Sequence, residues 1–363
     1  MLLPRGGTAD QVALQDVYGS CWIGREECLC PSLGRQTGLH SPYWTTTGLL
    51  CCRPARRKPE KRVELGKLAP PITFTSSLAL ILKVLSVIYK MVQDNTYATK
   101  RDIYYSDTLL FGRQSVVDNI VNDISCMLKI SRRSLHIVST TKGCIAGNLS
   151  YTEEDGTKVN CTCTATAVFV PSNVQGIRNV ITDAKFILIV EKDATFQRLL
   201  DDDFCNKLCP CIMITGKGVP DLNTRLLVRK LWDTCHIPIF TLMDADPHGI
   251  EIMCIYKYGS VSMSFEAHHL TVPAIRWLGL LPSDIERLNI PKDALIPLTK
   301  QDQNKLSSMQ KRPYVACQPL WKKEMEIMAA SRMKAEIQAL TSLSSDYLSR
   351  VYLPNKLHFG GWI

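Results

Sequence analysis

The sequence predicts an α/β protein of two domains, a winged helix-turn-helix domain followed by a domain built on a mostly parallel sheet. Three apolar segments that are typical of buried parallel strands recur at the spacing of βαβ units: Phe186–Val190, Cys211–Thr215 and Ile237–Met243. Amphipathic helical segments and a β-hairpin signal precede them. A length of 363 residues also favours two domains over one.

The composition indicates a folded protein with reduced cysteines. Apolar residues make up 45% of the chain, as in proteins with a sizeable core. The formal charge of +9 favours an anionic partner such as nucleic acid, although many basic proteins bind nothing anionic. The 15 cysteines are an odd number in a long chain without a signal peptide, so we expect cytosolic or nuclear thiols. The most hydrophobic segment, Leu78–Val92, is too short for a membrane span.

Residues 1–72 differ from the rest of the chain. They are rich in Gly, Pro, Arg and Cys and show no sustained period, so we expect a divergent and mostly disordered segment. The basic run Arg53–Arg62 is typical of a nuclear import signal, with a solvated linker as an equal alternative. Four cysteines here lack the paired Cys-x-x-Cys spacing of zinc sites: Cys28, Cys30, Cys51 and Cys52.

The first domain is expected to cover residues 73–165 and to begin with two helices. Ser76 or Ser77 is a suitable cap for a helix through Gln93, whose apolar stripe is Leu78, Leu82, Leu85 and Tyr89. A second helix is expected over Ser115–Lys129, where apolar residues recur at helical spacing: Val116, Val117, Ile120, Val121, Ile124, Met127 and Leu128.

A short third helix and a hairpin complete the predicted domain. Arg132 and Arg133 lie near the start of the segment Ser131–Leu135, which is expected to be helical. Ile145–Tyr151 and Thr157–Thr162 flank an Asp-Gly turn signal. Helices followed by a hairpin make a winged helix-turn-helix, which places a helix in the major groove and basic side chains on phosphates. We therefore expect both arginines to contact DNA.

Two adjacent tyrosines, Tyr104 and Tyr105, lie in this domain. By composition alone, such residues belong to a core or an amphipathic surface. Arg101 lies four residues before Tyr105, which is one turn of a helix. A phenol with a pKa near 10 needs a neighbouring cation or base to act as a nucleophile near neutral pH.

Carboxylates follow two of the predicted strands. Glu191 comes directly after the first strand, and Asp244 and Asp246 follow the third. Ligands in open α/β sheets collect beyond the carboxyl ends of the strands, so these side chains are expected at one edge. Carboxylate oxygens suit Mg²⁺, which keeps positions for water and phosphate. For Glu191 alone, an ordinary polar residue closing a buried strand is an equal alternative.

Four motifs together closely resemble the A subunit of DNA topoisomerase VI and, more narrowly, its vertebrate meiotic relative. The resemblance runs from about Ser76 to the C-terminus, and its motifs occur in the family's order: Arg101-Asp-Ile-Tyr-Tyr105, Phe186-Ile-Leu-Ile-Val-Glu191, Gly216-Lys-Gly-Val-Pro-Asp-Leu-Asn-Thr-Arg225 and Asp244-Ala-Asp-Pro-His-Gly249.

The resemblance implies a CAP-like winged-helix domain with the catalytic tyrosine, followed by a Toprim domain over residues 166–363. Tyr105 matches the family nucleophile and Arg101 the arginine that assists it. The magnesium ligands would be Glu191, Asp244 and Asp246, with an acid or base role as the alternative for Glu191. Lys217 and Arg225 would contact phosphate, with surface solubility as the competing role.

The family further implies that the tyrosine attacks a backbone phosphorus and forms a 5′-phosphotyrosyl link. Each protomer of a homodimer would cut one strand of double-stranded DNA, on meiotic chromosomes in the nucleus. Other meiotic break-forming proteins would assist, together with a B-type partner related to the topoisomerase ATPase. Residues 1–72 lack the amphipathic helix that docks on the B-type partner, so that contact is left open. The alternatives are a type IIB topoisomerase subunit that reseals DNA with an ATPase partner, or a catalytically silent DNA-binding isoform.

Overall fold

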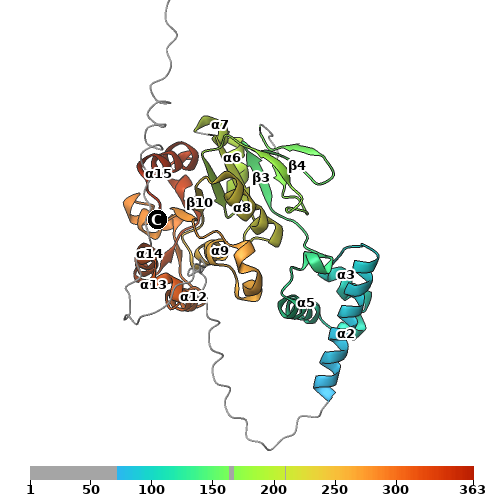
Figure 1. Ribbon diagram of the computed structural model, residues 1–363. Helices are drawn as coiled ribbons and strands as arrows, with labels where there is room; N and C mark the ends of the chain where they lie inside the picture. The colour runs from blue at the N-terminus through green and yellow to red at the C-terminus, as the bar shows by residue number, and fades with distance from the viewer. Residues whose placement is uncertain (1–71, 163–166, 209) are drawn as a thin grey trace, which may run out of the picture.

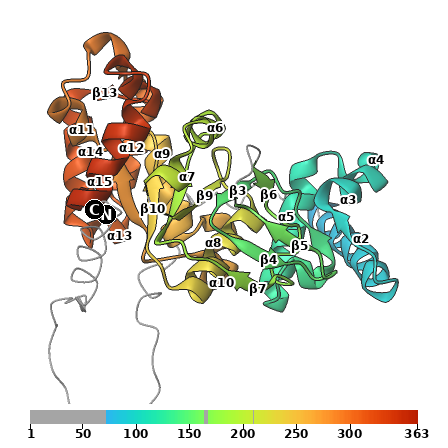
Figure 2. The same ribbon diagram turned by 90° about the horizontal axis from the view of Figure 1, so that it is seen from above.

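The computed structural model describes residues 72–162, 167–208 and 210–363. A helical domain, residues 72–138, lies beside an α/β domain, residues 144–363 (Figures 1 and 2). The segment 1–72 that was expected to be disordered lies outside the described residues except for Ile72, which begins a helix. The basic run and the four N-terminal cysteines also lie outside the described residues. Within the described residues, none of the helices combines the length and hydrophobicity that a membrane span needs.

The helical domain packs four helices around one apolar core. They are α2 (Ile72–Gln93), α3 (Lys100–Ser106), α4 (Thr108–Phe111) and α5 (Gln114–Leu128). Each helix except α4 contributes aliphatic side chains to the core, and α4 contributes an aromatic ring: Val84, Ile88, Ile103, Phe111, Val117, Val121 and Ile124. The amphipathic pattern of α5 therefore gave the correct helix, displaced by one residue.

The predicted apolar stripe of α2 is on the wrong face. The helix begins at Ile72, before Ser76 and Ser77, and Leu82 and Tyr89 of the expected stripe are 57% and 63% exposed. Val84 and Ile88 turn inward instead. Because α2 is apolar on more than one side, periodicity alone could not choose the face that meets α5.

Two smaller differences follow α5. The expected third helix is a single 3-10 turn, η1 (Arg133–Leu135). It leads into β2 (Ile137–Val138), which pairs in parallel with β1 (Ala98–Thr99) and so ties the end of the helical domain to the segment between α2 and α3.

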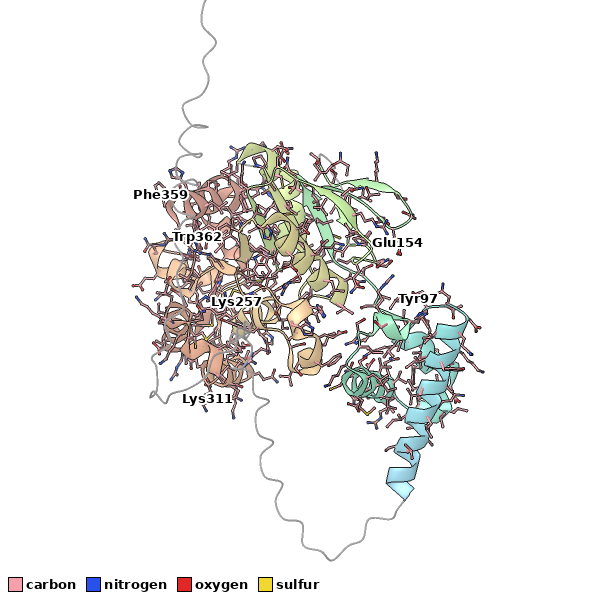
Figure 3. All side chains as sticks on the ribbon, in the orientation of Figure 1. Tyr97, Glu154, Lys257, Lys311, Phe359 and Trp362 are labelled. Carbon is pink, nitrogen blue, oxygen red and sulfur yellow. The ribbon has the colours of Figure 1, made fainter. Side chains whose placement is uncertain are left out.

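The predicted hairpin forms, with strands β4 (Ser150–Thr152) and β5 (Lys158–Asn160). A third strand, β7 (Arg178–Ile181), pairs with β4 and extends the hairpin to a three-stranded sheet. The preceding strand, β3 (Cys144–Gly147), pairs with β9 in the central sheet. Figure 3 shows Glu154, in the hairpin turn, on the α/β domain and above Tyr97 of the helical domain. The structure thus groups residues 144–162 with the α/β domain, although the sequence assigned them to the first domain. The winged arrangement stays a prediction.

The central sheet confirms the predicted mostly parallel architecture. Its strand order is β11-β10-β8-β9-β3-β6. The strands that pair in parallel are β8 (Phe186–Val190), β9 (Cys211–Thr215), β10 (Ile239–Leu242) and β11 (Arg276–Gly279). Only β3 runs in the opposite direction, and it pairs antiparallel with both β9 and β6 (Val168–Phe169). Every residue of β8 is buried, as its unbroken apolar run predicted.

Two layers cover the sheet because alternate residues of a strand point to opposite faces. Ile187 and Ile189 of β8 join one core, and Leu188 and Val190 join the other. The first core is covered by α8 (Leu222–Cys235), α9 (Pro247–Tyr258), α12 (Lys300–Gln310), α13 (Pro313–Ala316) and α14 (Pro319–Ser331). The second is covered by α6 (Asp193–Asp201), α7 (Phe204–Lys207), η4 (Ile337–Ser342), η5 (Leu348–Tyr352) and α15 (Leu353–Phe359).

Short elements complete the chain between these layers. They are η2 (Val261–Glu266), α10 (Ala267–Leu270), α11 (Pro282–Arg287), η3 (Lys292–Ala294) and the antiparallel pair of β12 (Ile296–Pro297) and β13 (Met333–Lys334).

The two faces of α2 give a direct test of this packing. Ile88→Ala should lower the free energy of unfolding by about 2–5 kcal/mol, because it leaves a cavity in the core. Leu82→Ala should change it by less than about 0.5 kcal/mol, because that side chain meets solvent. Urea unfolding of both variants measures the difference. Equal losses would contradict the assignment of the faces.

Candidate active site

The parallel pairing of β8 with β10 brings two predicted carboxylates together. Glu191 follows β8 directly, and Asp244 lies just beyond β10 at the same edge. The backbone N–H of Asp244 donates a hydrogen bond to Oε2 of Glu191 at 2.8 Å. Both side chains are buried. The sequence-predicted edge therefore exists, with the two residues in direct contact.

The start of α9 supplies the third carboxylate. Asp246 is the N-cap, and its Oδ1 accepts a hydrogen bond from the Gly249 N–H at 2.5 Å. A Cβ atom on Gly249 would lie 2.5 Å from the carbonyl oxygen of Asp244 and 2.9 Å from Oε2 of Glu191. Only glycine allows the helix to approach this closely. The acidic edge, formed by Glu191, Asp244 and Asp246, therefore depends on Gly249. The sequence motif contained this glycine, but hydrophobic periodicity did not single it out.

Burial and mutual repulsion dominate the electrostatics of this edge. Burial, reinforced by the charges of Asp244 and Asp246, raises the pKa of Glu191 to about 7. Burial also raises the pKa of Asp244, although its hydrogen bond with Lys192 opposes the change. A cation at this edge would relieve the repulsion.

Two of the partners of Asp244 are residues that sequence reasoning missed. Nζ of Lys192 lies 2.8 Å from Oδ2 of Asp244 and 3.2 Å from Oε2 of Glu336. The backbone N–H of Ile337 donates to Oδ1 of Asp244 at 2.8 Å. Lys192 could have been noticed beside Glu191, but Glu336 and Ile337 lie far along the chain and carry no local signal.

The donor set fits a hard divalent cation by chemistry. Three carboxylates supply oxygen ligands, as Mg²⁺ prefers. Across the described residues, however, no three Asp, Glu, His or Cys side chains are arranged to hold a metal ion together. Both oxygens of Asp244 already have protein partners, so a bound cation would take over the interaction that Lys192 makes.

A basic loop adjoins the acidic edge. The Gly218 N–H donates to the carbonyl oxygen of Glu191 at 2.9 Å, which fixes the loop to the end of β8. Nζ of Lys217 lies 3.2 Å from Oδ2 of Asp193, and Nζ of Lys142 donates to the Lys217 carbonyl at 3.0 Å. Lys217 thus lies on the loop that adjoins the end of β8, and its phosphate contact stays a prediction. Lys142 was not predicted.

The other predicted DNA contacts face the boundary between the domains. Arg225 is only 3% exposed, which contradicts both direct phosphate contact and a surface role in the domain arrangement seen here. Its Nη1 contacts Sδ of Met263 at 3.9 Å. The charges of Arg132 and Arg225 both act on buried Glu266, whose pKa is nevertheless raised by burial. Arg133 reaches the Ser172 carbonyl at 3.4 Å.

Tyr105 lies on α3, in the helical domain. Thr99 and Asp102 form a capping box that starts this helix, so Arg101 and Tyr105 lie one turn apart, as predicted. Tyr105 is 69% exposed, whereas Tyr104 is partly buried, with ring centroids 5.3 Å apart. In both views α3 lies well away from β10, the strand that Asp244 follows (Figures 1 and 2). The predicted nucleophile and the carboxylates are therefore not brought together within one chain.

Family models match both domains. The model for the Toprim domain of the topoisomerase 6 A subunit and Spo11 matches residues 186–357, and the model described as Type IIB DNA topoisomerase matches residues 76–137. The first match identifies the α/β domain as a Toprim domain and confirms that part of the predicted fold.

Individual relatives agree with these matches. Meiotic recombination protein SPO11 of Homo sapiens is 83% identical over 285 residues, which cover 78% of this chain and 72% of the relative. SPO11 of Mus musculus is 77% identical over the same shares. The DNA topoisomerase 6 A subunit of Arabidopsis thaliana is 39% identical over 282 residues, with shares of 77% and 66%. The chain belongs to the family that contains Spo11 and the topoisomerase 6 A subunit.

Gly249→Ala tests the close approach of α9 to the acidic edge. The added methyl group would clash with backbone, so the free energy of unfolding should fall by about 1–3 kcal/mol. His248→Ala, at an exposed neighbouring position of the same turn, should change it by less than about 0.5 kcal/mol. Chemical denaturation of the two variants provides the comparison, and an undisturbed Gly249→Ala protein would contradict the packing.

Proposed function

We propose that the chain is a topoisomerase-like DNA transesterase that makes meiotic double-strand breaks and so initiates homologous recombination. The observation that carries the proposal is the pairing of an exposed tyrosine, one helical turn from Arg101, with a separate acidic edge of a Toprim domain. The identity to proteins named for meiotic recombination supports the meiotic setting.

The chemistry at Tyr105 is an exchange of one phosphodiester for another. The phenolic oxygen attacks a backbone phosphorus, the new O–P bond forms, and the bond from phosphorus to the 3′ oxygen breaks. The phenol proton is lost, and the 3′ oxygen leaves as a hydroxyl after protonation. Arg101, one helical turn before Tyr105 on α3, would stabilise negative charge on the phenolate and the phosphate. No nucleotide is consumed at this step.

The acidic edge serves the leaving side of the reaction. Glu191, Asp244 and Asp246 would hold magnesium, which when bound neutralises charge on the phosphate and leaving oxygens. Glu191, whose pKa is raised to about 7, is also suited to donate or accept a proton near neutral pH. Lys217, fixed beside this edge, would contact an adjacent phosphate.

We infer that two chains are needed for each complete site. The separation of α3 from the acidic edge within one chain supports a homodimer in which Tyr105 of one protomer works with the carboxylates of the other. Double-stranded DNA, a B-type partner and other meiotic break-forming proteins would complete the assembly in the nucleus.

The second candidate is the A-type component of a type IIB topoisomerase. The 39% identity to a topoisomerase 6 A subunit favours it. Relaxation of supercoiled DNA on addition of an ATPase partner would support this function, whereas breaks that persist as protein-linked ends support the first.

Tyr105→Phe removes only the nucleophilic oxygen. Incubation of the variant with DNA and Mg²⁺ should therefore yield no protein covalently attached to 5′ ends, while DNA binding is retained. Tyr104→Phe is the matched control and should still form the adduct. The reverse pattern would move the nucleophile to Tyr104.

Glu191→Gln and Asp244→Asn each remove one charge from the acidic edge. Both should reduce Mg²⁺-dependent cleavage by about 100-fold or more, because charge at the phosphate is no longer neutralised. The yield of 5′-linked protein measures the loss. Retained cleavage in both variants would exclude the proposed role of the edge.

A further inference from the structure

Lys192 lies at the acidic edge, where it pairs with Asp244. It follows Glu191 directly and is the N-cap residue of α6, so its backbone is fixed by both the sheet and the helix. Its ammonium group lies 2.8 Å from Oδ2 of Asp244, a side chain that is 5% exposed. Among side chains of the described residues, Lys192 forms the only ion pair with Asp244.

The same ammonium group has a second set of partners on the outer side. Oε2 of Glu336 lies 3.2 Å away, and Oε1 of Gln338 accepts a hydrogen bond at 3.3 Å. Glu336 is about half-exposed, so this outer set is much better solvated than Asp244. Gln338 is itself oriented by donating to Oγ1 of Thr195 at 3.2 Å.

These contacts create a competition between two cations for one carboxylate. A divalent ion on Asp244 would lie within a few ångströms of the ammonium group if Lys192 kept its place. Two cations this close together repel one another strongly, because a partly buried site screens charge less than water does. Binding of the ion therefore requires Lys192 to release Asp244, and Glu336 and Gln338 already offer acceptors that would keep it.

We propose that Lys192 is a built-in counter-ion that holds Asp244 in place and yields this carboxylate to magnesium, with Glu336 as the acceptor that retains the displaced ammonium group. The inference deepens the proposed magnesium role of the edge. Lys192 and Glu336 are positioning residues, since they act through Asp244.

The test measures Mg²⁺ binding and thermal unfolding of the full chain without DNA. Lys192→Met should lower the melting temperature in chelator, because Asp244 loses its counter-charge. The same variant should bind Mg²⁺ about 10-fold more tightly in a calorimetric titration, because the competitor is gone. Lys192→Arg should retain wild-type behaviour in both measurements. A residue that served packing alone would not shift the two quantities in opposite directions.

Two further variants separate this effect from general charge. Lys217→Met removes the same charge from the same edge without touching Asp244, so its gain in Mg²⁺ affinity should be clearly smaller. Glu336→Gln should weaken Mg²⁺ binding, and this effect should disappear in the Lys192→Met background, because Glu336 acts through Lys192.

The outcomes distinguish the inference from the proposed function. One outcome would overturn the inference but not the proposed function. In that outcome the wild-type protein binds Mg²⁺, but Lys192→Met gains no more Mg²⁺ affinity than Lys217→Met does. If Lys192→Met does not fold, Glu336→Gln decides, since an unchanged Mg²⁺ affinity in that variant would overturn it equally. Wild-type protein that binds no Mg²⁺ would overturn both the inference and the metal role proposed above.

Discussion

The register between β8 and β10 is the constraint on which the acidic edge depends. Each strand is short and fully buried, and the pairing of Val190 with Leu242 places their ends level. The Glu191 N–H continues the ladder by donating to the Leu242 carbonyl at 3.0 Å. A shift of one residue would turn Glu191 to the other face of the sheet and remove it from Asp244. Two apolar cores, one on each face, hold this register.

The same burial that fixes the register makes it unfavourable for the carboxylates of the acidic edge to carry their charges. Carboxylates that are withdrawn from water and placed beside one another resist ionisation, as the raised pKa values of Glu191 and Asp244 indicate. The protein compensates locally, with an ammonium group and a backbone N–H on Asp244. A divalent cation would suit such a site because it would neutralise more of the negative charge than a single lysine does.

Much of this architecture could be predicted from local sequence, and the failures have a common cause. Unbroken apolar runs gave the parallel strands and, with them, the position of Glu191 and Asp244 at one edge. The exposed stripe of α2 and the burial of Arg225 could not be predicted, because composition does not say which neighbour a face will meet. Glu336 was missed for a related reason, since its role exists only after η4 packs against the strand ends.

The helical domain carries Tyr105, the proposed nucleophile. A capping box begins α3, and a buried Ile103 anchors it, so the helix is well fixed although its outer face is exposed. The proposed nucleophile, Tyr105, is exposed on this fixed helix and so accessible to DNA, whereas the proposed acidic edge of the described residues lies on the other domain. Under the proposed function, cleavage then requires that the acidic edge of a second chain approach Tyr105. Separating the nucleophile from the acidic edge in this way would keep an isolated chain from cutting DNA and would couple the reaction to assembly.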